Sequence, residues 1–96
     1  MDKKKKAKIN LDEIDFNDYV LHYTCNAPAQ EILDEYKIIA VGHVYGRQPR
    51  EMLLIPKKLI KKKGYSLEGD KLSISSNCEH LLVKIEDEYK RKHKNN

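Results

Sequence analysis

The pattern of apolar and polar residues along the chain predicts several β-strands. Aromatic and β-branched side chains, which favour strands, dominate residues 19–24 (Tyr-Val-Leu-His-Tyr-Thr). The nearly continuous apolar run at residues 38–45 is typical of a central strand. A turn follows at residues 46–50, and the short apolar run at residues 52–55 is suited to pair back as a hairpin.

A second hairpin is predicted over residues 65–74, around a two-residue Gly-Asp turn. In the register that this turn sets, Leu67 faces Leu72, and the charged residues beside the turn are opposite in sign. Because one register satisfies all of these pairs, the segment favours two further strands.

Helical spacing of apolar residues predicts two short helices. For the first, Asn26 is expected to cap the helix and Pro28 to lie in its first turn, where a missing N–H costs little. For the second, Pro56 is expected to open the helix and Gly64 to close it. The inward-facing residues are Ala29, Ile32, Leu33 and Tyr36 in the first helix, and Leu59 and Ile60 in the second.

A longer helix is predicted near the C-terminus. Ser76 and Glu79 form a capping box that starts this helix, and we expect it to run to about residue 92. Its inward stripe consists of Cys78, Leu81, Leu82, Ile85 and Tyr89. Its outward face carries three acid-before-base pairs four residues apart, which stabilise an exposed helix: Glu86–Lys90, Asp87–Arg91 and Glu88–Lys92.

The order of these elements indicates an α+β fold. We expect a single small domain with a mixed or antiparallel sheet of four or five strands, three helices and a long C-terminal helix. Residues 1–8 are a like-charge run and are expected to form a disordered basic tail. Residues 9–96 then form the domain, with the last few residues frayed.

Charge is unevenly distributed along the chain, whose formal net charge is +4. Residues 1–8 contain five Lys and one Asp, residues 9–56 have a net charge of −5, and residues 57–96 have a net charge of +5. Most of the bases are Lys, a bias that an AT-rich genome also produces. Lys meets phosphate as a point charge, whereas Arg makes bidentate contacts. Any basic binding surface is therefore expected to be local.

Several features indicate a cytoplasmic protein. No apolar run approaches the roughly 18 residues that a membrane span needs, so no membrane association is expected. The N-terminal lysines are not followed by the apolar stretch of a secretory signal. Without such a signal, Cys25 and Cys78 fit free thiols in a reducing compartment.

The chain contains enough donors for a tetrahedral zinc site, in His22, Cys25, Cys78 and His80. Structural zinc ligands are usually spaced by two to four residues, whereas Cys78 and His80 are separated by one residue at a helix start. No metal and no cofactor is therefore expected. The sequence also has no Gly-rich phosphate loop and no acid pair in an apolar frame, so no enzymatic activity is predicted.

One face of the second predicted helix is lined by lysines three and four residues apart: Lys57, Lys58, Lys61 and Lys62. Tyr65 lies next to this face, and Arg47 and Arg50 flank a turn that can approach it. We predict a small non-enzymatic regulatory or accessory module that binds the phosphate backbone of nucleic acid through these residues, aided by the lysine tails. The alternative interpretation of the same lysines is a solvated face that confers solubility.

The other predicted function is protein–protein interaction, as an inhibitor, an immunity-type protein or a subunit of a complex. It rests on residues 9–19, where the apolar residues Leu11, Ile14 and Phe16 alternate with acids. Such a segment can dock in a groove of another protein or cover one edge of the sheet. Asn10 and Glu13 form a capping pattern, which predicts a short helical turn over residues 11–16.

Overall fold

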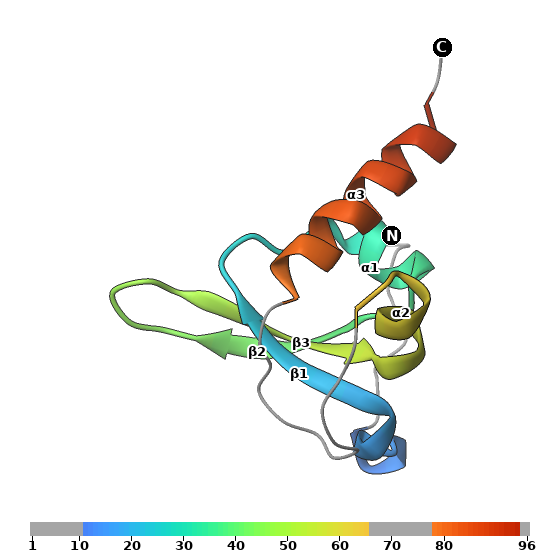
Figure 1. The fold of residues 1–96 in the computed structure, drawn as a ribbon. Coiled ribbons are helices and arrows are strands. Elements are labelled where there is room, and N and C mark those ends of the chain that lie inside the picture. The colour runs from blue at the N-terminus through green and yellow to red at the C-terminus, as the bar shows by residue number, and fades with distance from the viewer. Residues whose placement is uncertain (1–10, 66–77, 95–96) are drawn as a thin grey trace, which may run out of the picture.

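The computed structural model describes residues 11–65 and 78–94, which form an antiparallel sheet and three α-helices (Figure 1). The strands are β1 (Tyr19–Thr24), β2 (Ile39–Val44) and β3 (Arg50–Pro56), in the order β1-β3-β2. The helices are α1 (Gln30–Glu35), α2 (Lys57–Lys62) and α3 (Glu79–Lys92), and two 3-10 turns, η1 (Leu11–Glu13) and η2 (Phe16–Asp18), precede β1. The predicted α+β fold with three helices and a C-terminal helix is confirmed over these residues.

The prediction of four or five strands is not borne out. Over the described residues the sheet has three strands, and all of its pairings are antiparallel. The higher number counted the hairpin predicted at residues 65–74, of which residues 66–74 lie outside the described part of the chain. The basic tail predicted at residues 1–8 also lies outside it.

Strand β1 has the alternating burial of a strand that faces a core on one side. Val20, His22 and Thr24 are buried, whereas the residues between them are half-exposed. In the antiparallel register with β3, Val20 pairs with Ile55 and His22 with Leu53, so these side chains share one face of the sheet. The predicted strand boundaries at residues 19–24 are confirmed.

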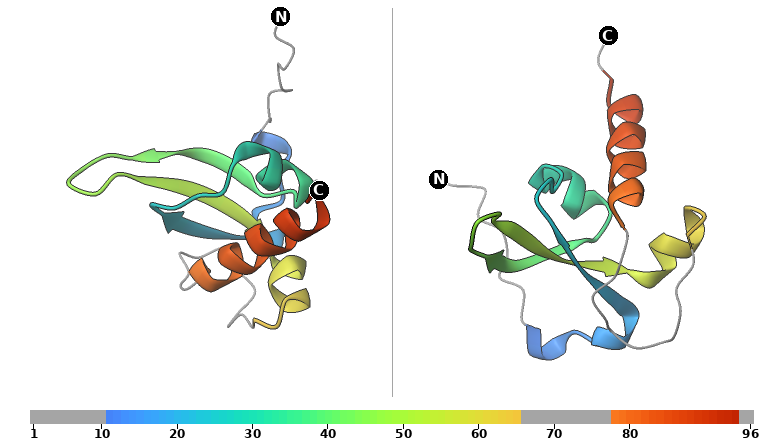
Figure 2. Two further views of the ribbon diagram at one scale, coloured as in Figure 1. Left: turned by 90° about the horizontal axis from the view of Figure 1, so that it is seen from above. Right: turned by 60° about the vertical axis from the view of Figure 1, so that its left-hand side comes forward.

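Helices α1 and α3 lie on the same side of the sheet and α2 continues from the end of β3, as Figures 1 and 2 show. The core combines apolar residues from all of these elements: Val20, Ile32, Leu33, Ile38, Leu53, Ile55, Ile60, Cys78, Leu81, Leu82 and Ile85. Burying each aliphatic side chain contributes about 1.5–3 kcal/mol. The inward stripe predicted for α3 is confirmed, with Tyr89 packed at its edge.

The start of α1 differs from the prediction. The residue before the helix is Ala29, which makes no side-chain capping hydrogen bond. The backbone N–H of Asn26 instead donates to the hydroxyl of Thr24 at 3.0 Å, which makes a Thr turn at the end of β1. The helix begins only at Gln30, so Asn26 does not cap it and Pro28 lies before its first turn.

The ends of α2 agree with the sequence, and those of α3 agree in part. Pro56 directly precedes α2, and Gly64 follows it with a φ of +91° that favours glycine. Helix α3 ends at Lys92, as predicted. Its predicted capping residue Ser76 lies outside the described residues, and the residue preceding the helix is Cys78.

The segment before β1 forms two short turns rather than one over residues 11–16. Asp15 lies between the two turns, directly before η2. Its side chain accepts a hydrogen bond from the backbone N–H of Asn17 at 3.0 Å. Because Asp competes with helix formation by bonding to nearby backbone, it caps η2 and stops a continuous helix.

None of the helices in residues 11–65 and 78–94 combines the length and the apolar character that crossing a bilayer requires.

Candidate nucleic-acid interface

Helix α2 presents its lysines because its two apolar residues anchor it to the core. Ile60 is buried and Leu59 is half-buried against the core. The helix begins directly after β3 with no intervening loop, so the direction of the strand sets its orientation. Lys58, Lys61 and Lys62 are exposed as a result.

The four lysines of α2 line one depression on the surface, with a volume of about 760 Å³. The remaining lining comes from the η2–β1 junction, from the turn after α1 and from the start of α2: Asp18, Tyr19, Tyr36, Lys37, Pro56 and Leu59. Five lysines thus face one carboxylate in this depression. Lys37, Tyr19 and Tyr36 join the site from elements distant in sequence, and the sequence interpretation missed all three.

Antiparallel pairing explains why Tyr19 lies beside the lysine helix. Tyr19 is the first residue of β1, and its partner in the register is Pro56, the last residue of β3. Lys57 follows Pro56 directly. The sheet therefore fixes one tyrosine at the point where α2 begins.

Lys37 reaches the same depression from the turn between α1 and β2. Its φ is +62°, the left-handed conformation that usually falls to glycine at the end of a helix. The neighbouring backbone closes the helix end, since the N–H of Ile38 donates to the carbonyl of Leu33 at 2.8 Å. A residue with a Cβ in this conformation costs about 1–2 kcal/mol.

The positive charge of this depression is largely uncompensated. Within the described residues, Lys37, Lys58, Lys61 and Lys62 form no ion pair. Lys57 and Lys58 also lie in the first turn of α2, where the helix dipole disfavours cations. The arrangement attracts anions. The helix dipole favours Lys61 and Lys62, which lie in the last turn, but it does not account for Lys57 and Lys58.

Tyr36 occupies the base of this region under two further lysines. The Nζ of Lys63 lies 5.9 Å and that of Lys92 lies 5.7 Å from the centre of its ring, within the range of cation–π attraction. Its hydroxyl is buried and has no hydrogen-bond partner among the described residues. Tyr36 therefore meets the neighbouring lysines through its ring and not through its hydroxyl.

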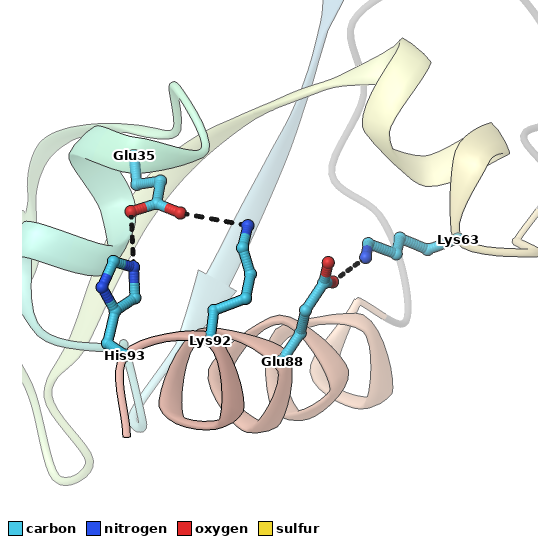
Figure 3. A network of polar contacts seen from close by, with 5 residues as sticks. All are labelled: Glu35, Lys63, Glu88, Lys92 and His93. Carbon is cyan, nitrogen blue, oxygen red and sulfur yellow. Dashed lines mark hydrogen bonds and ion pairs between the residues drawn. The ribbon is translucent and has the colours of Figure 1, made fainter. Parts of the chain in front are cut away.

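Ion pairs hold both of these lysines in place (Figure 3). Glu88 of α3 pairs with Lys63. Glu35 of α1 accepts from Lys92 at 3.4 Å and contacts Nε2 of His93 at 3.1 Å. Glu88 and Lys92 were predicted to pair with each other along α3. Tertiary packing instead pairs Glu88 with Lys63, directly after α2, and Lys92 with Glu35 of α1.

A second depression, of about 510 Å³, lies between the end of α2 and helix α3. Its lining is Lys62, Lys63, Gly64, Lys84, Asp87, Glu88 and Arg91. Tyr65 lies on this side, with the Nζ of Lys84 at 5.0 Å from its ring centre. Of the residues predicted from the sequence, Tyr65 is thus near the lysine helix but outside the first depression.

The structure does not bring Arg47 and Arg50 onto the lysine face. Arg50 is the first residue of β3, whereas the lysines follow its last residue. A seven-residue strand spans roughly 20 Å, at about 3.3 Å per residue. Arg47 lies in the connection between β2 and β3, which points away from α2 (Figure 1).

The segment predicted to bind a protein partner is partly exposed. The side chain of Phe16 is 38% exposed and that of Ile14 is half-buried. Leu11, the third predicted residue, lies in η1. The acids around Phe16, including Asp15 and Asp18, are exposed.

The four residues considered for zinc do not come together. His22 and Cys78 are buried, whereas Cys25 and His80 are exposed. In the described part of the chain, no group of three or more His, Cys, Asp or Glu side chains is placed to hold a metal ion.

Comparisons with known protein families, with curated proteins and with solved structures found no match to this chain.

Proposed function

We propose that this protein is a small non-enzymatic nucleic-acid-binding module of regulatory or accessory kind. It contacts the phosphate backbone through the lysines of α2 together with Lys37. The observation that supports this proposal most strongly is the single depression in which five lysines gather around Tyr19 and Tyr36, with Asp18 as the one acid in its lining.

The chemistry of this depression matches a polyanion. Each lysine that meets a phosphate releases condensed counterions, which is the main source of sequence-independent affinity for nucleic acid. Four of these lysines form no ion pair within the described residues and therefore have no such contact to give up: Lys37, Lys58, Lys61 and Lys62. Lys63 and Lys92, which are paired with Glu88 and Glu35, are less suited to this task.

The proposal is tested by measuring the fluorescence anisotropy of labelled single-stranded and duplex oligonucleotides over a range of salt concentrations. The variant K57A/K58A/K61A/K62A should bind much more weakly at low salt. The slope of log K against log salt should fall by about 3 to 4 units, at about 0.7–0.9 per phosphate contact. Circular dichroism confirms that the variant is folded.

A matched control removes the same four charges at a distance from the depression. The variant R47A/R50A/K90A/K94A changes two hairpin arginines and two exposed lysines that do not line it. Its salt slope should stay close to that of the wild type. An equal loss in both variants shows that total charge, and not this surface, governs binding, and it contradicts the proposal.

A second candidate function is the recognition of a protein partner through Phe16. This large apolar side chain remains 38% exposed among acidic neighbours, an arrangement that suits a partner with a basic-rimmed apolar groove. Phe16→Ala should abolish capture of a specific partner and leave the thermal unfolding temperature unchanged. A partner that is retained by this variant, or a variant that unfolds, removes the basis of this candidate.

A further inference from the structure

We infer that the site takes a single strand of nucleic acid rather than a duplex, and that the strand runs from the depression beside α2 to the second depression on α3. This inference rests on the proposed function and adds the class of ligand and its path.

The first reason is the shape of the site. Both basic surfaces are open depressions, of about 760 and 510 Å³, on the surface of a small domain. A duplex is a convex cylinder that carries its phosphates on the outside, so it meets a small hollow only at the rim. A single strand can place individual nucleotides inside.

The second reason is the apolar floor of the first depression. Tyr19, Pro56 and Leu59 are half-buried and lie among the lysines. A protein that only contacts the backbone of a duplex gains nothing from such a floor. Unpaired bases stack on aromatic rings whatever their sequence, and binding sites for single strands combine this stacking with a basic groove.

The third reason is continuity between the two depressions. Lys62 lines both of them, so they meet at the C-terminal end of α2. The second contains four bases (Lys62, Lys63, Lys84 and Arg91) against two acids, so positive charge continues along this path. A strand that enters beside Tyr19 can therefore pass over Lys62 toward Arg91.

The first test compares an oligothymidylate and an oligouridylate of about 12 nucleotides with a duplex of the same length. Either single strand should bind about 10-fold or more tightly than the duplex. Tyr19→Ala should weaken single-strand binding by about 5- to 100-fold and leave the salt slope unchanged, because a stacking surface is lost but no charge. Tyr19→Phe keeps the ring and should bind like the wild type. Tyr19→Leu keeps an apolar side chain but loses the ring, so it should fold normally and bind as weakly as Tyr19→Ala.

The second test measures the path with oligonucleotides of two lengths. K84A/R91A should lower the salt slope by about 1.4 for the strand of about 12 nucleotides, at about 0.7 per contact. It should leave the affinity of a strand of about 3 nucleotides unchanged, because this strand occupies only the first depression. K90A/K94A removes one charge from α3 and one from the residues that follow it, both outside the two depressions, and should change neither value.

The outcomes separate this inference from the proposed function. Failure of every oligonucleotide to bind overturns both. Duplex binding as tight as single-strand binding, with Tyr19→Ala neutral, overturns the single-strand inference and leaves phosphate binding standing. Polyglutamate that displaces oligothymidylate at equal charge concentration also overturns the inference, because the site then responds to charge alone.

Discussion

His22 of β1 and Glu79 of α3 face each other at the helix-covered side of the sheet, with His22 Nε2 at 3.6 Å from Glu79 Oε2. His22 is 4% exposed and Glu79 is 47% exposed. Burial lowers the pKa of His22 below its ordinary value of 6.5, and the Glu79 carboxylate opposes this effect only in part. The folded protein therefore holds a neutral imidazole at neutral pH.

This relationship predicts that the protein loses stability in mild acid. In the unfolded chain His22 regains its ordinary pKa, so the unfolded state binds a proton more readily than the folded state. The free energy of unfolding should fall as pH drops below about 6.5 and stop changing from this source below the lowered pKa. Urea unfolding between neutral and mildly acidic pH measures this dependence.

Two variants isolate the contribution of His22. His22→Leu should show a shallower loss of stability in acid than the wild type, because the titrating group is gone. Glu79→Gln should show a steeper loss, because it removes the carboxylate that raises the pKa of His22. Parallel pH profiles for the wild type and His22→Leu would assign the acid sensitivity to other groups.

Lys37 is predicted to lower the stability of the fold and to strengthen oligonucleotide binding. Lys37→Gly should raise the free energy of unfolding by about 0.5–1 kcal/mol, because glycine adopts a positive φ without a steric penalty but loses more chain entropy on folding. It should also lower the salt slope of oligonucleotide binding by about 0.7–0.9. Lys37→Ala is the matched control: it should lose the same binding contribution without the gain in stability. Equal stability of these two variants would contradict the role of backbone strain.

Tyr36→Phe is predicted to leave the fold intact and to be neutral or stabilising. The Tyr36 hydroxyl is buried without a hydrogen-bond partner in the described residues, so its removal relieves an unpaired polar group. The expected gain in the free energy of unfolding is up to about 1 kcal/mol. Chemical denaturation measures it, and a loss of more than about 1 kcal/mol would show that the hydroxyl is satisfied.

The two cysteines are predicted to differ in reactivity. Cys25 is exposed and Cys78 is 5% exposed in the core, and neither forms a disulfide within the described residues. A thiol reagent such as dithionitrobenzoate should modify Cys25 promptly and Cys78 only when the core opens. Cys25→Ser should remove the fast phase and Cys78→Ser the slow phase. Two fast phases in the native protein would contradict the packing of Cys78.

Local signals in the sequence were sufficient for several elements. Side-chain type marked β1, the spacing of Pro56 and Gly64 marked α2, and the period of apolar residues marked the buried stripe of α3. The start of α1 was predicted wrongly: Asn26 belongs to the turn that ends β1, where its backbone N–H donates to the Thr24 hydroxyl, and the helix begins only at Gln30.

The candidate site likewise depends in part on local sequence and in part on tertiary structure. Helical periodicity alone determined that the α2 lysines share a face, because residues three and four apart are neighbours on any helix. The tertiary structure decided what faces them: the antiparallel register places Tyr19 opposite Pro56, and the turn after α1 brings in Lys37. It also separated Arg50 from the lysines by the full length of β3, because an extended strand carries its two ends apart. Sequence fixes which side chains an element presents, and only the packing of elements distant in the chain decides which of them meet.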